Sequence, residues 1–221
     1  LGSVAGAGAA PISSVGTRSL PAMRSFLLGQ QLYRHGAADS ARVAYRAALE
    51  SDSTFALAWR GVASVFIREG RENDPEAIRA LEMAIRYKSG RSPRDSMLLR
   101  ADSLRLAFRS RVPGGTDAVD DIPLLQQLFA ALNAATQRYP SDSELWFERA
   151  DAAYHFGPLA GVPQSDAANW FRRGTALDSS FIVSYFHSFD IALREGNTTQ
   201  AAQSARSIAR LQGGVFAAYF G

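Results

Sequence analysis

The sequence predicts an all-α protein built from antiparallel helix pairs. From about Ala22 onward, apolar residues fall at helical spacing. Alternating strand patterns and Asn-Gly hairpin turns are absent. A set of small and large residues also recurs about 34 residues apart, which is typical of a repeated helix-turn-helix unit that buries its apolar face against its neighbours.

The composition agrees with a folded chain and excludes several kinds of site. The 221 residues are 47% hydrophobic and contain no Cys, which excludes disulfides, a thiol nucleophile and Cys-ligated metal sites. No window of 18 uninterrupted apolar residues occurs, so we expect no transmembrane segment. Residues 1–111 hold 17 basic and 10 acidic residues, and residues 112–221 hold 7 and 11. The first half is therefore basic and the second half acidic.

Three regions are expected along the chain. Residues 1–21 are rich in Gly, Ala and Ser and show no apolar period, so we expect a flexible arm or linker. Residues 22–214 form the repeat domain. Residues 215–221 form an apolar C-terminal segment, which we expect to cover apolar surface of the last helix pair. No signal peptide is visible and residue 1 is Leu, so we expect a part of a longer protein.

The first two predicted units have nearly the same length. In the first, small and large residues take the positions of a helix-turn-helix repeat, namely Gly29, Leu32, Ala41, Tyr45 and Ala48. The second begins 34 residues further on, with Trp59 and Ala63 in corresponding positions. The apolar residues of its second helix are displaced by two positions, so we expect a longer turn across residues 71–75.

The third predicted unit departs from the pattern. Its first helix covers residues 94–109, where one apolar face is present but the aromatic and small positions are not recognisable. A Pro-Gly-Gly turn at 113–115 leads to a long helix that begins near Asp120, with Asp120 and Asp121 as its N-terminal cap. We expect a hairpin of altered geometry at this point.

The fourth and fifth units return to the pattern. The fourth starts after Pro140 and carries Trp146, and the last carries Tyr185 in the corresponding position. Residues 157–165, GPLAGVPQS, are predicted to form a turn with five extra residues. We expect Trp59 and Trp146 to be largely buried where the helices of a hairpin pack.

These residues resemble the tetratricopeptide repeat (TPR) over roughly residues 22–213. In that family the pattern is W-x2-L-G-x2-Y, then A-x3-F, then an Ala and a loop Pro. The resemblance implies a right-handed superhelical solenoid of about five hairpins. Three segments, including SPRDSMLLRADSL and AYHFGPLAGV, are similar to the C-terminal repeat regions of bacterial serine/threonine protein kinases and related signalling proteins. That narrower resemblance implies a location on the periplasmic side of a membrane, as part of a membrane-associated protein or complex.

In the TPR family, fixed positions of each first helix line a concave groove, and these positions give the candidate binding residues. The groove they form combines aromatic rings with arginines and carboxylates, so we expect it to hold a protein or peptide. The candidates are Phe26, Gln30, Tyr33, Arg34, Arg60, Ser64, Arg68, Phe147, Asp151, Tyr154, Phe186, Asp190 and Arg194. The expected anchors among them are Phe26, Tyr33, Phe147 and Tyr154.

Catalytic and cofactor motifs are absent from the sequence. It contains no nucleophile elbow, P-loop, metalloprotease motif or kinase signature, so we expect no enzymatic activity and no cofactor. No two of the three histidines, His35, His155 and His187, have the helical spacing of a metal pair. We expect them at the surface or at helix C-termini rather than as metal ligands.

The strongest charge run covers residues 79–111, with nine basic and three acidic residues. Few aromatic residues lie within it, so we expect a solvated arginine-rich face or a docking face for an acidic partner, rather than a nucleic-acid site.

The sequence thus favours a non-catalytic scaffold that binds a protein or peptide through its concave groove and the edges of the array. Two alternatives stay open. One is a sensory or regulatory domain of a membrane-anchored bacterial kinase, and the other is a structural subunit that stabilises a larger complex at a membrane. Nucleic acid is not an expected partner, and peripheral membrane association is compatible with the sequence. Neither the identity of the partner nor the oligomeric state follows from these patterns.

Overall fold

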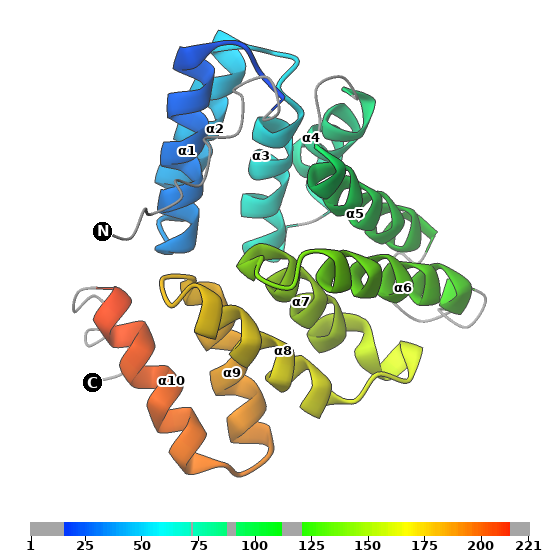
Figure 1. Cartoon of the computed structure of the whole chain (residues 1–221), viewed down its shortest axis with the longest axis vertical. Coiled ribbons are helices and arrows are strands. Elements are labelled where there is room, and N and C mark those ends of the chain that lie inside the picture. Colours follow the sequence, from blue (N-terminus) through cyan, green and yellow to red (C-terminus); the bar gives the residue numbers. More distant parts are fainter. Residues whose placement is uncertain (1–15, 72, 88–91, 112–120, 213–221) are drawn as a thin grey trace, which may run out of the picture.

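The computed structural model describes residues 16–71, 73–87, 92–111 and 121–212, without the side chains of 109–111. All regular elements in these residues are helices, which pair in chain order into five antiparallel hairpins (Figure 1). This arrangement confirms the predicted all-α fold. The helices are α1 (Leu20–Arg34), α2 (Ala38–Ser51), α3 (Ala56–Arg68), α4 (Pro75–Arg86), α5 (Pro93–Arg111), α6 (Ile122–Arg138), α7 (Ser143–Ala160), α8 (Gln164–Leu177), α9 (Ile182–Arg194) and α10 (Thr198–Leu211).

The same turn closes three of the hairpins. Gly36, Gly70 and Gly196 follow α1, α3 and α9 with φ of 86°, 70° and 68°, a left-handed conformation that glycine adopts without steric penalty. In each turn the glycine N–H donates to the carbonyl three residues earlier, and the next N–H donates to the carbonyl five residues earlier. Gly36 and Gly70 lie 34 residues apart, so the turn geometry confirms the register of the first two units.

A second repeated feature involves Trp59, Trp146 and Tyr185 at the start of α3, α7 and α9. Each side chain donates to the carbonyl oxygen six residues earlier, at 2.8, 3.0 and 3.4 Å respectively. The shared contact supports the predicted equivalence of these positions. Both tryptophans were expected to be largely buried, and in the structure each is mostly covered but not fully buried. The indole lies against the loop between hairpins, where its N–H finds a partner and its edge stays in contact with solvent.

The first three helices pack closely around Tyr45 of α2. A Cβ atom added to Gly29 of α1 or to Gly61 of α3 would lie 2.6 Å from the Tyr45 ring. The ring therefore occupies space that any larger residue at either glycine would fill. These two small residues permit the close approach of α1 and α3 to α2.

The predicted turn at residues 157–165 is shorter in the structure, because α7 continues through Pro158 to Ala160. Proline has no N–H to donate to the carbonyl of Tyr154 one turn earlier. The side-chain amide of Gln164 donates to that carbonyl instead, at 3.2 Å, so the helix extends without an unpaired carbonyl at this point. It ends at Gly161, whose φ is 72°.

The third hairpin, for which the sequence predicts altered geometry, makes little contact with the second. α4 and α5 make the least extensive contact of any two consecutive helices within the described residues. In Figure 1, α5 and α6 run across the direction of α1 and α3. Asp121 takes the N-cap position of α6 without a capping side-chain hydrogen bond. Asp120 and the turn at 113–115 lie outside the described residues.

The boundary of the predicted N-terminal arm needs correction. Thr17 is buried and donates to Asp52 at 2.5 Å, and Ser19 caps the helix that begins at Leu20 by accepting from the N–H of Ala22. The last residues of 1–21 therefore belong to the folded body. Residues 1–15 and the C-terminal segment 215–221 lie outside the described residues.

The array curves until its first hairpin contacts its last. Arg34 lies 3.7 Å from Asp178, and the rings of Tyr33 and Phe181 meet edge to face at 6.1 Å. Figure 1 shows the lower end of α1 beside the α8–α9 loop and α10. This contact between the two ends of the array turns the concave side of the solenoid into an inner face.

Candidate functional site

The inner face contains a pocket of about 480 Å³. The first helix of every hairpin contributes to its lining, with Tyr33 from α1, Ser64 and Arg68 from α3, Arg105 from α5, Asp151 from α7 and Phe186 from α9. A volume in this range accommodates a small molecule or a few side chains of a peptide. The first helix of each hairpin was expected to line the concave surface, and the pocket is lined by these helices.

The structure brings several of the predicted groove residues together at this pocket. Those in its lining are Tyr33, Ser64, Arg68, Phe147, Asp151 and Phe186. Arg68 also donates to the backbone carbonyls of Tyr33 and Gly36 at 3.0 and 2.6 Å, so its guanidinium caps the C-terminal end of α1. Phe186 is 36% exposed and forms an accessible part of the lining.

Other predicted residues lie elsewhere. Gln30, Arg34 and Arg60 border a smaller hollow of about 40 Å³, which adjoins the pocket and is lined from α1, α2, α3, α5 and α7. It is too small for a peptide. Tyr154, Asp190 and Arg194 form a surface group outside the pocket lining. Tyr154 donates to Asp190 at 2.5 Å, and Arg194 lies 2.8 Å from the same carboxylate.

Two of the expected anchors are core residues. Phe26 is 4% exposed, with its ring 4.8 Å from that of Phe55, and Phe147 is 5% exposed, with its ring 4.4 Å from that of Phe181. The expectation that these rings project into an open groove is wrong, because neighbouring hairpins and the closure of the array cover them. Phe26 is therefore not available to a partner, whereas Phe147 exposes only a small area at the pocket lining.

Beneath the pocket lies a buried group of ion pairs centred on Arg60. Its guanidinium contacts Asp102 of α5 at 2.7 Å and Glu144 of α7 at 2.6 Å, and it also donates to Glu148. Arg60 is only 7% exposed. Burial lowers the pKa of Arg60, but the surrounding carboxylates raise it well above its usual value. The side chain predicted to face a partner therefore connects three helices of its own chain.

Two arginines of the predicted basic run extend this group. Arg105 lies 3.1 Å from Glu148 and 3.6 Å from Asp151, while Arg94 contacts Asp142 at 2.7 Å and Glu144 at 2.6 Å. The expectation of a solvated or partner-docking face along 79–111 is therefore wrong for Arg94 and Arg105, whose charges face α7.

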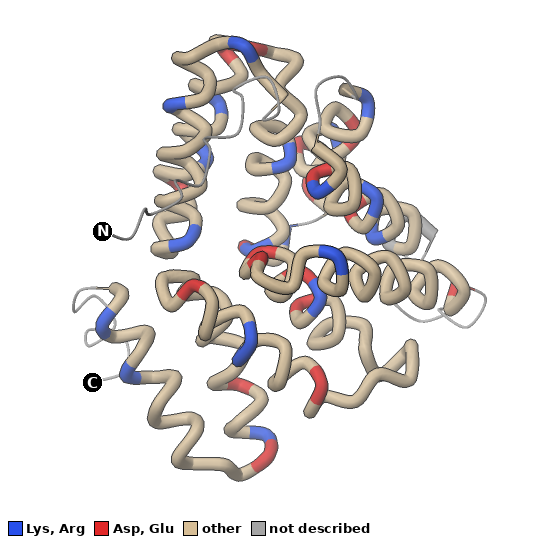
Figure 2. Tube along the Cα trace, in the orientation of Figure 1, with Lys and Arg blue, Asp and Glu red and all other residues tan. Residues whose placement is uncertain are grey.

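We call the whole set the central ion network. It consists of Arg60, Arg94, Arg105, Asp95, Asp102, Asp142, Glu144, Glu148 and Asp151. Basic and acidic positions gather at the centre of the molecule where α3, α5 and α7 approach one another (Figure 2). Its arginines come from the basic half of the sequence and four of its carboxylates from the acidic half, so the opposite charges of the halves meet inside the fold.

The carboxylates on α7 differ in their pKa. Burial raises the pKa of Glu144, but Arg94 and Arg60 outweigh this effect and lower it to about 2. Burial also raises the pKa of Glu148, and in this case the arginines do not reverse the shift. For Asp151, burial again raises the pKa, but contacts with His155 and His187 and the charge of Arg105 hold it well below the usual range.

The low pKa of Glu144 predicts a pH-dependent contribution to stability. Replacing Glu144 with Gln should lower the free energy of unfolding by about 2 kcal/mol at pH 7, because two charged donors lose their anionic acceptor. The folded pKa of about 2 lies below the unfolded value of 4.5, so this stabilisation is present above pH 4.5 and is lost as the pH falls toward 2. Urea denaturation of wild type and variant across this range measures the difference.

The exposed residue Glu50 supplies the matched control for this experiment. The Glu50→Gln variant should have nearly the stability of wild type at every pH. A wild-type advantage over Glu144→Gln that stays constant from pH 7 to pH 2 would show that the charge of Glu144 does not contribute.

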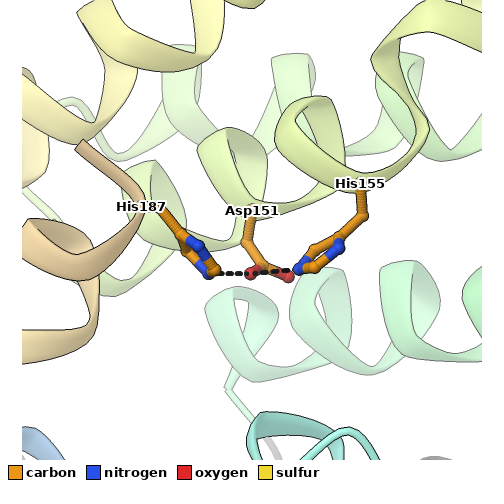
Figure 3. A group of neighbouring side chains, drawn as sticks. All are labelled: Asp151, His155 and His187. Atoms are coloured by element: carbon orange, nitrogen blue, oxygen red, sulfur yellow. Dashed lines mark ion pairs between the residues drawn. The ribbon is translucent and has the colours of Figure 1, made fainter. Parts of the chain in front are cut away.

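The structure also assembles a group that the sequence analysis missed. His155, one helical turn after Asp151 on α7, and His187 on α9 both point their Nε2 atoms at Asp151, at 3.5 and 3.2 Å (Figure 3). The spacing of Asp151 and His155 placed two ligand-type side chains on one helix face, and that was the available signal. His187 joins them only through the packing of α9 on α7.

Comparison with solved structures identifies the fold. The structure is similar to TTC0263, a thermophilic TPR protein of Thermus thermophilus, at a TM-score of 0.56 and 17% sequence identity over 88% of this chain and 93% of that chain. YrrB, described as a TPR protein with an unusual peptide-binding site, matches at 0.39 and 17% over 88% of each chain. PilF of Pseudomonas aeruginosa matches at 0.35 and 17% over 89% and 94%. No family model and no curated protein matches.

The similarity to TTC0263 confirms the all-α TPR-like solenoid predicted from the sequence. At this identity it shows the fold alone. The narrower resemblance to kinase repeat regions is not shown by these comparisons. Among the described residues, no helix has both the length and the apolar character needed to cross a membrane.

Proposed function

We propose that this chain is a non-catalytic protein-interaction scaffold that receives a short segment of a partner protein in the pocket of its inner face. The observation that carries the proposal is the lining of that pocket by the first helices of all five hairpins. Such a surface can contact several side chains of an extended segment at once, as concave solenoid surfaces generally do.

The chemistry of the pocket favours a segment with an apolar side chain. Phe186 is exposed at the pocket, and Tyr33, Phe156 and Val183 contribute further apolar surface. Buried aromatic contacts usually supply most of the binding energy of an interface. The inward orientation of Arg94 and Arg105 supports a protein partner over nucleic acid, since these two charges are already paired with carboxylates.

Peptides selected from a random display library against the wild-type chain provide the test. The Kd of these peptides should be at least about tenfold higher for the Phe186→Ala variant than for wild type, because the substitution removes the accessible ring. Val43 is an exposed apolar residue on the second helix of the first hairpin, and Val43→Ala should leave the Kd unchanged. Fluorescence anisotropy gives both values, and circular dichroism confirms that each variant is folded. Failure to select any binder, or equal Kd values for wild type and Phe186→Ala, would contradict the proposal.

A regulatory domain of a membrane-anchored kinase and a structural subunit of a larger complex are two narrower forms of this function. Both would employ the same inner face and differ in the molecule that occupies it. Co-purification from the native source and mass spectrometry distinguish them by the identity of the bound protein.

A further inference from the structure

Asp151, His155 and His187 form a compact group at the wall of the pocket, which we call the histidine cluster. Asp151 and His155 lie one turn apart on α7, and His187 comes from α9. One ligand atom from each residue can be chosen so that all three lie within 4.8 Å of one another. In Figure 3 the two imidazole rings approach the carboxylate from opposite sides.

Two of the three separations within the cluster are close to those between ligands of one metal ion. The two Nε2 atoms lie 3.2 and 3.5 Å from the same Asp151 oxygen, Oδ1, whereas charged N–H to carboxylate hydrogen bonds are typically about 2.7–2.9 Å long. Ligand atoms bound to Zn²⁺ at about 2.0–2.2 Å in tetrahedral geometry are separated from each other by about 3.3–3.6 Å. The two nitrogen-oxygen separations are close to that spacing, and the ligand atoms of the whole group lie within 4.8 Å of one another, so a small rotation of one imidazole brings the three to a common ion.

The surrounding charge favours a cation at this position. Asp151 belongs to the central ion network, in which six carboxylates face three arginines. Among the described side chains, the network therefore has a formal excess of three negative charges when all of its groups are ionised. A divalent cation at the histidine cluster would offset most of this excess, and its effect is strong because Asp151 and Glu148 are buried.

Neighbouring side chains hold the cluster in place. Arg105 lies 3.6 Å from Oδ2 of Asp151, which leaves Oδ1 directed at the two imidazoles. The ring of Tyr154 lies 4.3 Å from that of His187 at an angle of 30°, and its hydroxyl donates to Asp190. Such contacts orient ligand side chains before an ion binds. The His155 side chain is 43% exposed, so an ion can reach the cluster from the pocket.

We propose that Asp151, His155 and His187 bind a divalent transition-metal ion, and that Zn²⁺ is the ion this ligand set favours. Two imidazole nitrogens and one carboxylate oxygen suit Zn²⁺, whereas Mg²⁺ and Ca²⁺ prefer ligand sets made of oxygen alone. Three protein ligands leave at least one coordination position open toward the pocket, where a water molecule or a donor atom of a bound segment completes the site.

Titration of the untagged full chain with Zn²⁺ in a calorimeter tests the site directly. We expect one ion bound per chain, no comparable binding of Mg²⁺, and a visible absorption band of four- or five-coordinate geometry when Co²⁺ is added instead. His155→Gln and His187→Gln should each weaken Zn²⁺ binding by more than about 100-fold, because loss of a direct ligand should exceed the effect of losing a supporting contact. Zn²⁺ should also raise the Tm of wild type but not of these variants.

The chain supplies a matched control in His35. The sequence contains three histidines and no Cys, and His35 is the one that lies outside the cluster, at the C-terminal cap of α1. His35→Gln should bind Zn²⁺ as wild type does. Absence of binding by wild type, or equal binding by wild type and the folded double variant His155→Gln/His187→Gln, would overturn the proposal. No partner protein is needed for this experiment, so its result is separate from that of the peptide-binding test.

Discussion

Replacing Arg60 with Ala is expected to lower the free energy of unfolding by about 3–5 kcal/mol. The substitution removes the guanidinium that contacts Asp102, Glu144 and Glu148 and leaves these carboxylates without their shared counter-charge. Removing one partner of a buried ion pair is costly because the remaining charge stays out of water. Urea denaturation at pH 7, followed by circular dichroism, measures the change.

Arg46 provides the control for this prediction, because it also pairs with a glutamate but at the surface. Arg46 and Glu76 have side chains that are 48% and 43% exposed, and Arg46→Ala should therefore change stability by at most about 1 kcal/mol. The stability loss of Arg60→Lys should lie between those of Arg60→Ala and Arg46→Ala, because one ammonium group cannot reproduce the planar set of guanidinium donors. Equal effects of Arg60→Ala and Arg46→Ala would mean that the central ion network does not hold α3, α5 and α7 together.

Replacing Tyr45 with Ala should also cost about 3–5 kcal/mol, the range for loss of a large buried aromatic side chain. Tyr45 is 3% exposed, and its ring fills the space left by Gly29 of α1 and Gly61 of α3. Thermal and urea denaturation of the variant give the size of the effect. A loss below about 1 kcal/mol would show that α1 and α3 can close the space by themselves.

The two glycines allow a sharper test of the same packing. In wild type, Gly61→Ala should destabilise by about 1–3 kcal/mol, because the new Cβ would overlap the Tyr45 ring. In the Tyr45→Ala background, the same substitution should instead stabilise by up to about 1 kcal/mol, since alanine is the better helix former. Gly174 of α8 is the control, because its added Cβ would meet its nearest neighbour at an ordinary 3.5 Å. An effect of Gly61→Ala that is the same in both backgrounds would exclude the direct contact.

Local features of the molecule were predictable from the sequence alone. The 34-residue spacing, the helical periodicity and the glycine turns act within one hairpin, where neighbouring residues in the chain determine the structure. This explains why the all-α repeat fold agrees with the expectation. The extension of α7 through Pro158 is the local exception. It depends on Gln164, whose side chain replaces the missing backbone donor.

The inner face, in contrast, depends on how small rotations between successive hairpins add up over the array. That sum brings α1 against the α8–α9 loop. Packing between adjacent hairpins buries Phe26 and Phe147 and directs Arg94 and Arg105 toward α7. The repeat pattern states which residues belong to first helices, but it contains no information on the final curvature. The all-helical repeat was therefore determined by the sequence pattern. The pocket of the inner face, the paired charges beneath it and the meeting of His155 with His187 were decided by tertiary packing, because these contacts join residues from different hairpins.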